Sequence, residues 1–149
     1  MPRVRDLMTV DVPLTTLNTP VSDAARLMKA TDRDSLVVFD LGRATGIVTE
    51  RDIIRKITAE GKDAMKVHVA DIVSTPLITI HPDKSAREAA ALMLAKKVRH
   101  LPVVKEGRLL GMITLQDFAK HMSKKSVKDE ILESMGRDAD ESLAVIAQG

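Results

Sequence analysis

One seven-residue stretch occurs twice and decides the fold: Gly46–Asp52 reads GIVTERD, and Gly111–Asp117, 65 positions later, reads GMITLQD. Each copy keeps a glycine, a threonine and an aspartate at the same spacing. The same offset aligns the rest of the first half with the second without a gap, so that Leu27-Met28 meets Leu92-Met93. A chance match does not hold one register over this length, and the chain is therefore an internal duplication.

Each copy predicts the same order of elements, β-α-β-β-α. Short β-branched runs on either side of a glycine-containing turn indicate a hairpin, and the apolar run between polar flanks indicates a helix. In the first copy we expect an extended piece at 12–14, a helix from Pro20, strands at 36–39 and 46–49 around a turn at 41–43, and a helix from Glu50. In the second copy we expect an extended piece at 77–80, a helix after Ser85, strands at 101–104 and 111–114 around a turn at 106–108, and a helix from Leu115.

Three local signals refine these elements. Ser85 and Glu88 have the spacing of a capping box, which predicts a helix start. Thr19 before Pro20 predicts the N-cap of the first helix. Pro102 within a strand favours an edge position or a special backbone position, because proline donates no ladder hydrogen bond.

The duplication also predicts the domain organisation. A three-stranded sheet with one helix layer has little core of its own, so we expect an α/β (α+β) fold in which two units pack as a pseudo-twofold pair. We expect unit one at 1–62, unit two at 63–125 and a helical tail at 126–149, with 59–66 as the linker. The tail has no counterpart in the first copy, and its apolar residues recur at helical spacing: Val127, Ile131, Leu132 and Met135.

The composition excludes several kinds of chemistry. The chain has 149 residues, no cysteine, two Phe and no Tyr or Trp, with a formal net charge of +2. Thiolate catalysis, disulfides and cysteine zinc sites are therefore excluded, and aromatic stacking on nucleic-acid bases has little support. No apolar run approaches the roughly 18 residues of a membrane helix, and no signal peptide is recognisable, so a cytoplasmic protein is expected.

Five motifs in repeat register resemble the CBS domain, named for its occurrence in cystathionine β-synthase. They are Val4–Thr9, Gly46–Asp52, Val69–Ser74, Arg99–Val104 and Gly111–Asp117, and the resemblance covers about residues 1–122. It implies a tandem pair (a Bateman module) with two clefts between the units. It also implies adenosine-containing ligands, namely AMP, ADP, ATP or S-adenosylmethionine, with Asp52 and Asp117 on the ribose hydroxyls.

The residues themselves support such a site. A carboxylate accepts two hydrogen bonds from a cis-diol, and charge-assisted bonds are the stronger kind. Thr49 and Thr114 each stand three residues before the aspartate, where a strand meets a helix start that suits a ribose-phosphate junction. The alternative is that Thr49/Asp52 and Thr114/Asp117 only cap their helices. The two roles are compatible, since a cap can be shared with a ligand.

The resemblance also assigns the base and the phosphates. Arg99 is expected to anchor phosphate with His100 as a second donor, whereas Asp34 and Ser35 stand at the matching positions of the first copy and Arg33 precedes them. We therefore expect two inequivalent clefts, one for phosphorylated ligands and one that binds a less charged ligand, binds weakly or stays empty. The adenine slot is expected from residues that otherwise serve core packing: Val12, Pro13, Val37, Leu77, Ile78 and Pro102.

The leading hypothesis is a regulatory, ligand-sensing homodimer. Ala24-Ala25 and Ala89–Ala91 would permit close helix approach between subunits. A ligand-independent protein-interaction scaffold and a nucleic-acid-binding module are the alternatives, with the lysines near the tail favouring the latter. No catalytic cofactor, metal site or membrane partner is expected, and no enzyme, because no nucleophile and base can be assembled from these motifs.

Overall fold

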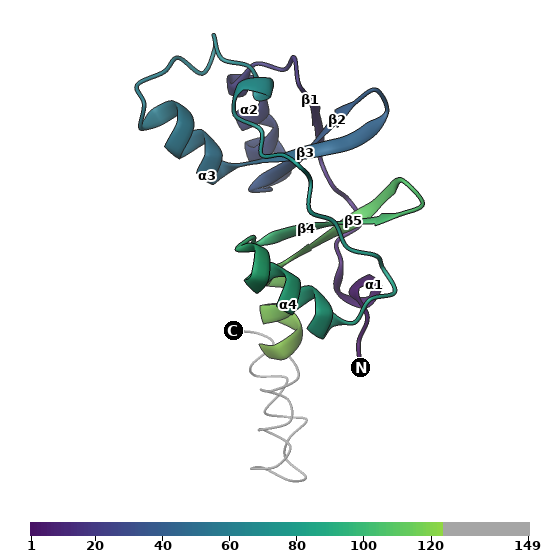
Figure 1. Ribbon diagram of the computed structural model, residues 1–149. Coiled ribbons are helices and arrows are strands. Elements are labelled where there is room, and N and C mark those ends of the chain that lie inside the picture. The colour runs from purple at the N-terminus through teal and green to yellow at the C-terminus, as the bar shows by residue number, and fades with distance from the viewer. Residues whose placement is uncertain (124–149) are drawn as a thin grey trace.

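The computed structural model describes residues 1–123, which form two halves of similar design joined at a narrow waist (Figure 1). The first half contains β1 (Leu14–Thr16), α2 (Val21–Thr31), β2 (Ser35–Asp40), β3 (Arg43–Thr49), α3 (Glu50–Ile53) and the π-helical turn η1 (Ile54–Thr58). The second contains α4 (Ala86–Lys96), β4 (His100–Lys105), β5 (Arg108–Thr114) and helical residues 115–123. Two short helices precede the halves in sequence, α1 (Val4–Leu7) and the 3-10 helix η2 (Val69–Asp71). The expected mixed α/β fold with two repeated units is confirmed.

The sheets differ slightly between the halves. In the first, β1 runs parallel to β2 and β3 runs antiparallel to β2, with Val37 opposite Leu14 and Ile47. In the second, β4 and β5 form the only extended ladder, and the expected strand at 77–80 is reduced to a parallel bridge between Ile80 and Val103. Pro82 follows two residues later without a backbone donor, so the ladder cannot continue along that segment. The expectation of a three-stranded sheet in each half therefore holds for the first half and is wrong for the second, whose sheet has two strands.

The two hairpin turns form as the sequence predicts. Leu41 and Gly42 have φ values of 51° and 77°, and Glu106 and Gly107 have the same two values. Two central residues with positive φ define the type I′ turn, whose twist matches that of the flanking strands. These turns set the register that places each Thr-x-x-Asp sequence at the end of β3 or β5.

The helix starts confirm one predicted cap and correct the other. Ser85 accepts a hydrogen bond from the Glu88 N–H at 3.0 Å, and the Ser85 N–H donates to the Glu88 carboxylate at 2.8 Å. The N-cap of α2 is Pro20, not Thr19, because Pro20 keeps an extended backbone and the helix begins one residue later. The Val21 N–H then finds its acceptor in the distant Val67 carbonyl, at 2.8 Å.

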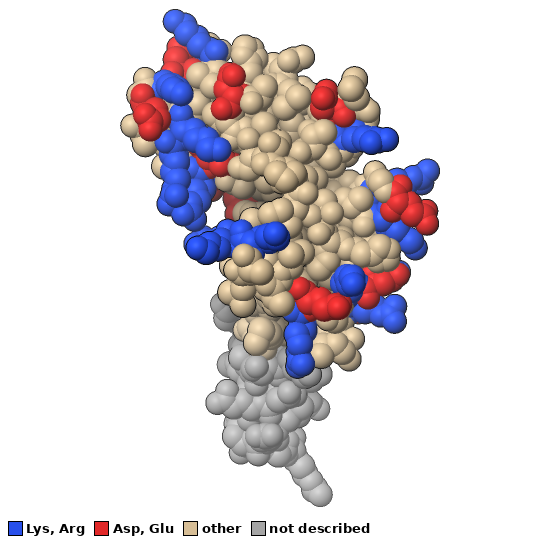
Figure 2. Space-filling view, viewed as in Figure 1, with Lys and Arg blue, Asp and Glu red and all other residues tan. Residues whose placement is uncertain are grey.

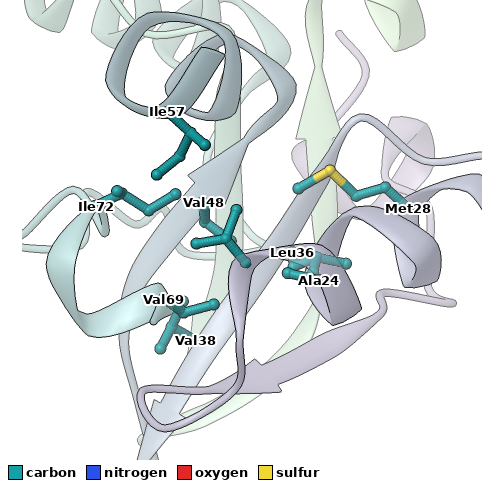
Figure 3. Close-up of a cluster of buried hydrophobic side chains, with 9 residues drawn as sticks. Ala24, Met28, Leu36, Val38, Val48, Ile57, Val69 and Ile72 are labelled. Atoms are coloured by element: carbon teal, nitrogen blue, oxygen red, sulfur yellow. The ribbon is translucent and has the colours of Figure 1, made fainter. Parts of the chain in front are cut away.

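Each half completes its core with a segment from the other repeat. Figure 3 shows the first core, where Val69 and Ile72 pack with Leu36 and Val48 although they open the second repeat. In the second core, Val4 from the first repeat packs with Leu101, Val103 and the other buried residues of that half. The two halves therefore exchange their leading segments, and neither core is complete without the other repeat.

Burial narrows the expected dimer face to part of its alanines. Ala24 and Ala89 are 1% and 0% exposed inside their own cores, because helices α2 and α4 turn these small residues onto their sheets. These two are not free to form a helix contact between subunits, whereas Ala25, Ala90 and Ala91 remain at least partly exposed. None of the described helices is long and apolar enough to cross a bilayer. The predicted tail, with Val127, Ile131, Leu132 and Met135, lies outside the described residues.

Candidate functional site

A cavity of about 760 Å³ lies at the junction of the two halves. The first half contributes the C-terminal end of α2, the start of β2, the start of α3 and four residues ahead of β1, namely Thr9, Asp11, Val12 and Pro13. The second half contributes Met112, Thr114, Gln116, Asp117 and Lys120, from the end of β5 and the helix that follows it. A molecule in this cavity would contact both repeats at once.

Asp117 divides its two carboxylate oxygens between a cap and the cavity. Oδ2 accepts the Thr114 N–H at 2.8 Å and the Thr114 hydroxyl at 3.1 Å. Among residues 1–123, Oδ1 accepts only one hydrogen bond, a long one of 3.4 Å from the hydroxyl of Thr9 in the other repeat. The capping role therefore leaves one anionic oxygen with acceptor capacity in the cavity wall.

Asp52 has the same cap but a different second partner. Its Oδ2 accepts from the Thr49 N–H at 3.0 Å and from the Thr49 hydroxyl at 3.1 Å. Its Oδ1 lies 3.3 Å from Nζ of Lys56, and that ammonium also donates to the Ile72 carbonyl at 2.8 Å. A ligand hydroxyl at Asp52 would have to displace this lysine, so the two aspartates are not equivalent.

The residues predicted for the base slot separate into two groups. One group lines the cavity: Val12, Pro13 and Ser35. Together with Ile53 and Met28 they form an apolar wall that contains one buried hydroxyl group, that of Ser35. Val37 and Pro102 are fully buried, and their neighbours in the strands belong to the two hydrophobic cores. Because successive side chains of a strand point to opposite faces, Val37 and Pro102 face away from the helices that cover those cores. Leu77 is half-buried and Ile78 packs against the second core, and neither lines the cavity.

Arg99 and His100 also lie outside the cavity lining. Arg99 is exposed, and Nε2 of His100 lies 2.9 Å from Oδ1 of Asp34, a cavity residue of the other half. The repeat offers a signal for this contact, because a pseudo-twofold axis brings the start of β2 against the start of β4.

The surface charge is distributed unevenly around the junction of the two halves. Figure 2 shows lysine and arginine side chains gathered on the α3 side of the waist.

Sequence reasoning missed several participants, among them Thr9, Lys56 and Glu50. Lys56 occupies the second oxygen of Asp52, and Glu50 joins Asp34 in the cavity wall. The position of Lys56 one helical turn after Asp52 was the available signal, since residues four apart share a helix face. Among residues 1–123, no group of three or more histidine or acidic side chains is arranged to hold a metal ion.

Comparisons with known proteins agree on the repeat. A family model of the CBS domain matches residues 4–59 and 69–124. The CBS domain-containing protein YhcV of Bacillus subtilis is 35% identical over 119 residues, which cover 80% of this chain and 84% of YhcV. A Burkholderia ambifaria protein named for signal transduction and CBS domains has a TM-score of 0.72 at 34% identity, covering 76% of this chain and 83% of its own. A hexameric CBS-CP12 protein from bloom-forming cyanobacteria shares the fold, with a TM-score of 0.75 at 23% identity and coverage of 99% and 96%.

Proposed function

Because the chain belongs to the CBS domain family, we propose that it is a regulatory module that binds an adenosine-containing small molecule in the cavity between its repeats. One observation carries this proposal. Asp117 keeps an anionic oxygen available in a cavity of about 760 Å³, a volume that suits a nucleoside. Its twin Asp52 is neutralised by Lys56, so the proposal assigns the ligand to Asp117.

Each part of the ligand has a chemically suitable partner. The ribose diol donates to Oδ1 of Asp117, and Thr9 is close enough to share that interaction. The adenine ring lies against Val12, Pro13 and Ile53, with the Ser35 hydroxyl and nearby backbone groups as its polar partners. Such a ligand has partners in both repeats and favours one relative orientation of the halves, which a regulated protein could read.

Calorimetry with adenosine, AMP, ATP and S-adenosylmethionine tests the proposal, using Asp117→Asn and Asp52→Asn as a matched pair. Both substitutions alter the same kind of cap, but only Asp117 lines the cavity. We expect Asp117→Asn to weaken binding about tenfold or more, since it removes a charge-assisted bond, and Asp52→Asn to change it little. Equal effects of both substitutions, or no binding of any adenosine compound to the wild type, would contradict the proposal.

Two further parts of the proposal concern the second cleft and assembly. Arg99 and His100 are proposed to favour phosphorylated ligands in the cleft that they serve. The chain is also proposed to be a cytoplasmic homodimer without catalytic activity. Leu94, Leu115 and Met122 of the second half, which are 80%, 48% and 63% exposed, are the apolar side chains that such a dimer contact could cover. Light scattering of the purified protein distinguishes a dimer from a monomer or a hexamer.

A further inference from the structure

The cavity carries an excess of negative charge. Three cationic side chains line it, Lys29, Arg33 and Lys120, and five carboxylates oppose them. The carboxylates belong to Asp11, Asp32, Asp34, Glu50 and Asp117. If Asp117 takes the ribose, four carboxylates and three cations face the rest of the ligand. The cavity therefore offers a poor electrostatic environment for the two to four negative charges of a nucleotide.

Backbone dipoles do not reverse this balance. The C-terminal end of α2, which carries the negative end of the helix dipole, borders the cavity through Met28 and Lys29, although the Asp32 and Arg33 N–H groups cap the carbonyls of these two residues. At the start of the helix at 115–123, which could attract phosphate, the Leu115 N–H donates to the Arg99 carbonyl and the Asp117 N–H to the Thr114 hydroxyl. Two of its first three donors are therefore already occupied.

Asp34 and Glu50 form the acidic part of the wall that the fold does not require. The Glu50 N–H donates to the Asp34 carbonyl at 2.9 Å, which places the two residues side by side. The second half makes the same backbone bond, at 3.3 Å, between Leu115 and Arg99. The repeat thus builds this junction equally well with an uncharged and a basic residue, so the junction itself does not require two acids, although Asp34 also contacts His100 of the other half.

We propose that Asp34 and Glu50 are specificity determinants that make this cavity prefer an adenosyl ligand with a cationic 5′ substituent over an adenine nucleotide. A sulfonium or ammonium group beside this pair gains attraction from both carboxylates, whereas a 5′-phosphate is repelled by them. The His100 contact holds Asp34 in position at the cavity edge. This inference rests on the proposed adenosine site and specifies the charge of its ligand.

Calorimetry with four probes tests the inference. S-adenosylmethionine and S-adenosylhomocysteine differ by one methyl group and the sulfonium charge, and AMP and ATP supply increasing negative charge. We expect the wild type to bind S-adenosylmethionine about tenfold tighter than S-adenosylhomocysteine and to bind ATP weakest of the four. Because these side chains are exposed, the preference should shrink when ionic strength rises from about 0.05 to 0.5 M.

The double variant Asp34→Asn/Glu50→Gln keeps the shape of both side chains and removes their charge. It should lose most of the sulfonium preference and gain affinity for AMP, whereas Asp40→Asn, an exposed acid of β2 outside the cavity, should change neither. Equal melting temperatures of the variants establish that they remain folded. An unchanged ratio in the double variant, or tighter AMP than S-adenosylmethionine binding in the wild type, would overturn the inference while leaving the adenosine site intact. Failure of all four probes would overturn both.

Discussion

Thr9 and Met112 exchange both of their backbone hydrogen bonds, each at 2.9 Å, although they belong to different repeats. This pair attaches the leading segment of the first repeat to β5 of the second half, directly before Thr114 and Asp117. The equivalent pair, Ile47 and Ser74, attaches the second leading segment to β3 at 3.0 and 3.3 Å. The exchange places the Thr9 hydroxyl against Asp117, so the cavity wall depends on it.

Gly111→Ala should disrupt this exchange. A Cβ at Gly111 would lie 2.6 Å from the Thr9 carbonyl oxygen, and backbone cannot move aside without breaking the paired hydrogen bonds. We expect a loss of about 2 kcal/mol or more in the free energy of unfolding, measured by denaturant titration.

Gly107→Ala is the matched control in the same hairpin. It meets nothing within 4 Å but has φ of 77°, so it should lose only about 1 kcal/mol. The reverse order would contradict the close-approach argument.

Leu41→Asn should stabilise the protein. Leu41 has φ of 51° at the first position of a type I′ turn and is 95% exposed, so its side chain contributes strain and little packing. Asparagine tolerates this conformation, and Asn-Gly is the preferred pair for such a turn. A gain of about 0.5 to 1 kcal/mol is expected in denaturant titration. Glu106→Asn in the equivalent turn should behave alike, and a destabilised Leu41→Asn would imply that Leu41 makes a contact in the assembled protein.

Local patterns predicted what is decided locally. The hairpin turns, the Ser85–Glu88 cap and the repeat order could all be read from spacing, and so could the placement of Asp117 at a strand-to-helix junction. The contacts of these residues could be predicted only in part. The spacing of four residues places Lys56 on the helix face of Asp52, but the ion pair itself and the His100–Asp34 contact depend on how the side chains and the two halves pack. The exchange of leading segments also has no local signature, because Val4 and Val69 look the same whichever core they enter.

Stability should fall in acid partly through Glu88. The backbone N–H of Ser85, and then the nearby charge of Lys84, hold the pKa of Glu88 below its usual 4.5. A carboxyl group whose pKa is lowered by folding stabilises the native state above its unfolded pKa, and that contribution disappears as pH falls through the folded pKa. The wild type should therefore lose more stability than Glu88→Gln when denaturant titrations at pH 7 and at about pH 3 are compared. Parallel losses in the two proteins would show that this cap does not contribute to acid sensitivity.

Lys56→Met should free the Asp52 carboxylate to bind a second ligand. The ammonium of Lys56 contacts both Asp52 and the Ile72 carbonyl, so its removal leaves one carboxylate oxygen and one carbonyl without that partner. Because Lys56 is 44% exposed, the expected cost is small, about 0.5 to 1 kcal/mol in unfolding free energy. Asp52 would then resemble Asp117, and calorimetry should detect a second, weaker adenosine site in addition to the one expected in the wild type. Arg55→Met, which removes a neighbouring exposed cation, controls for the change in net charge. If Lys56→Met still binds one ligand per chain, then something other than this lysine makes the two aspartates unequal.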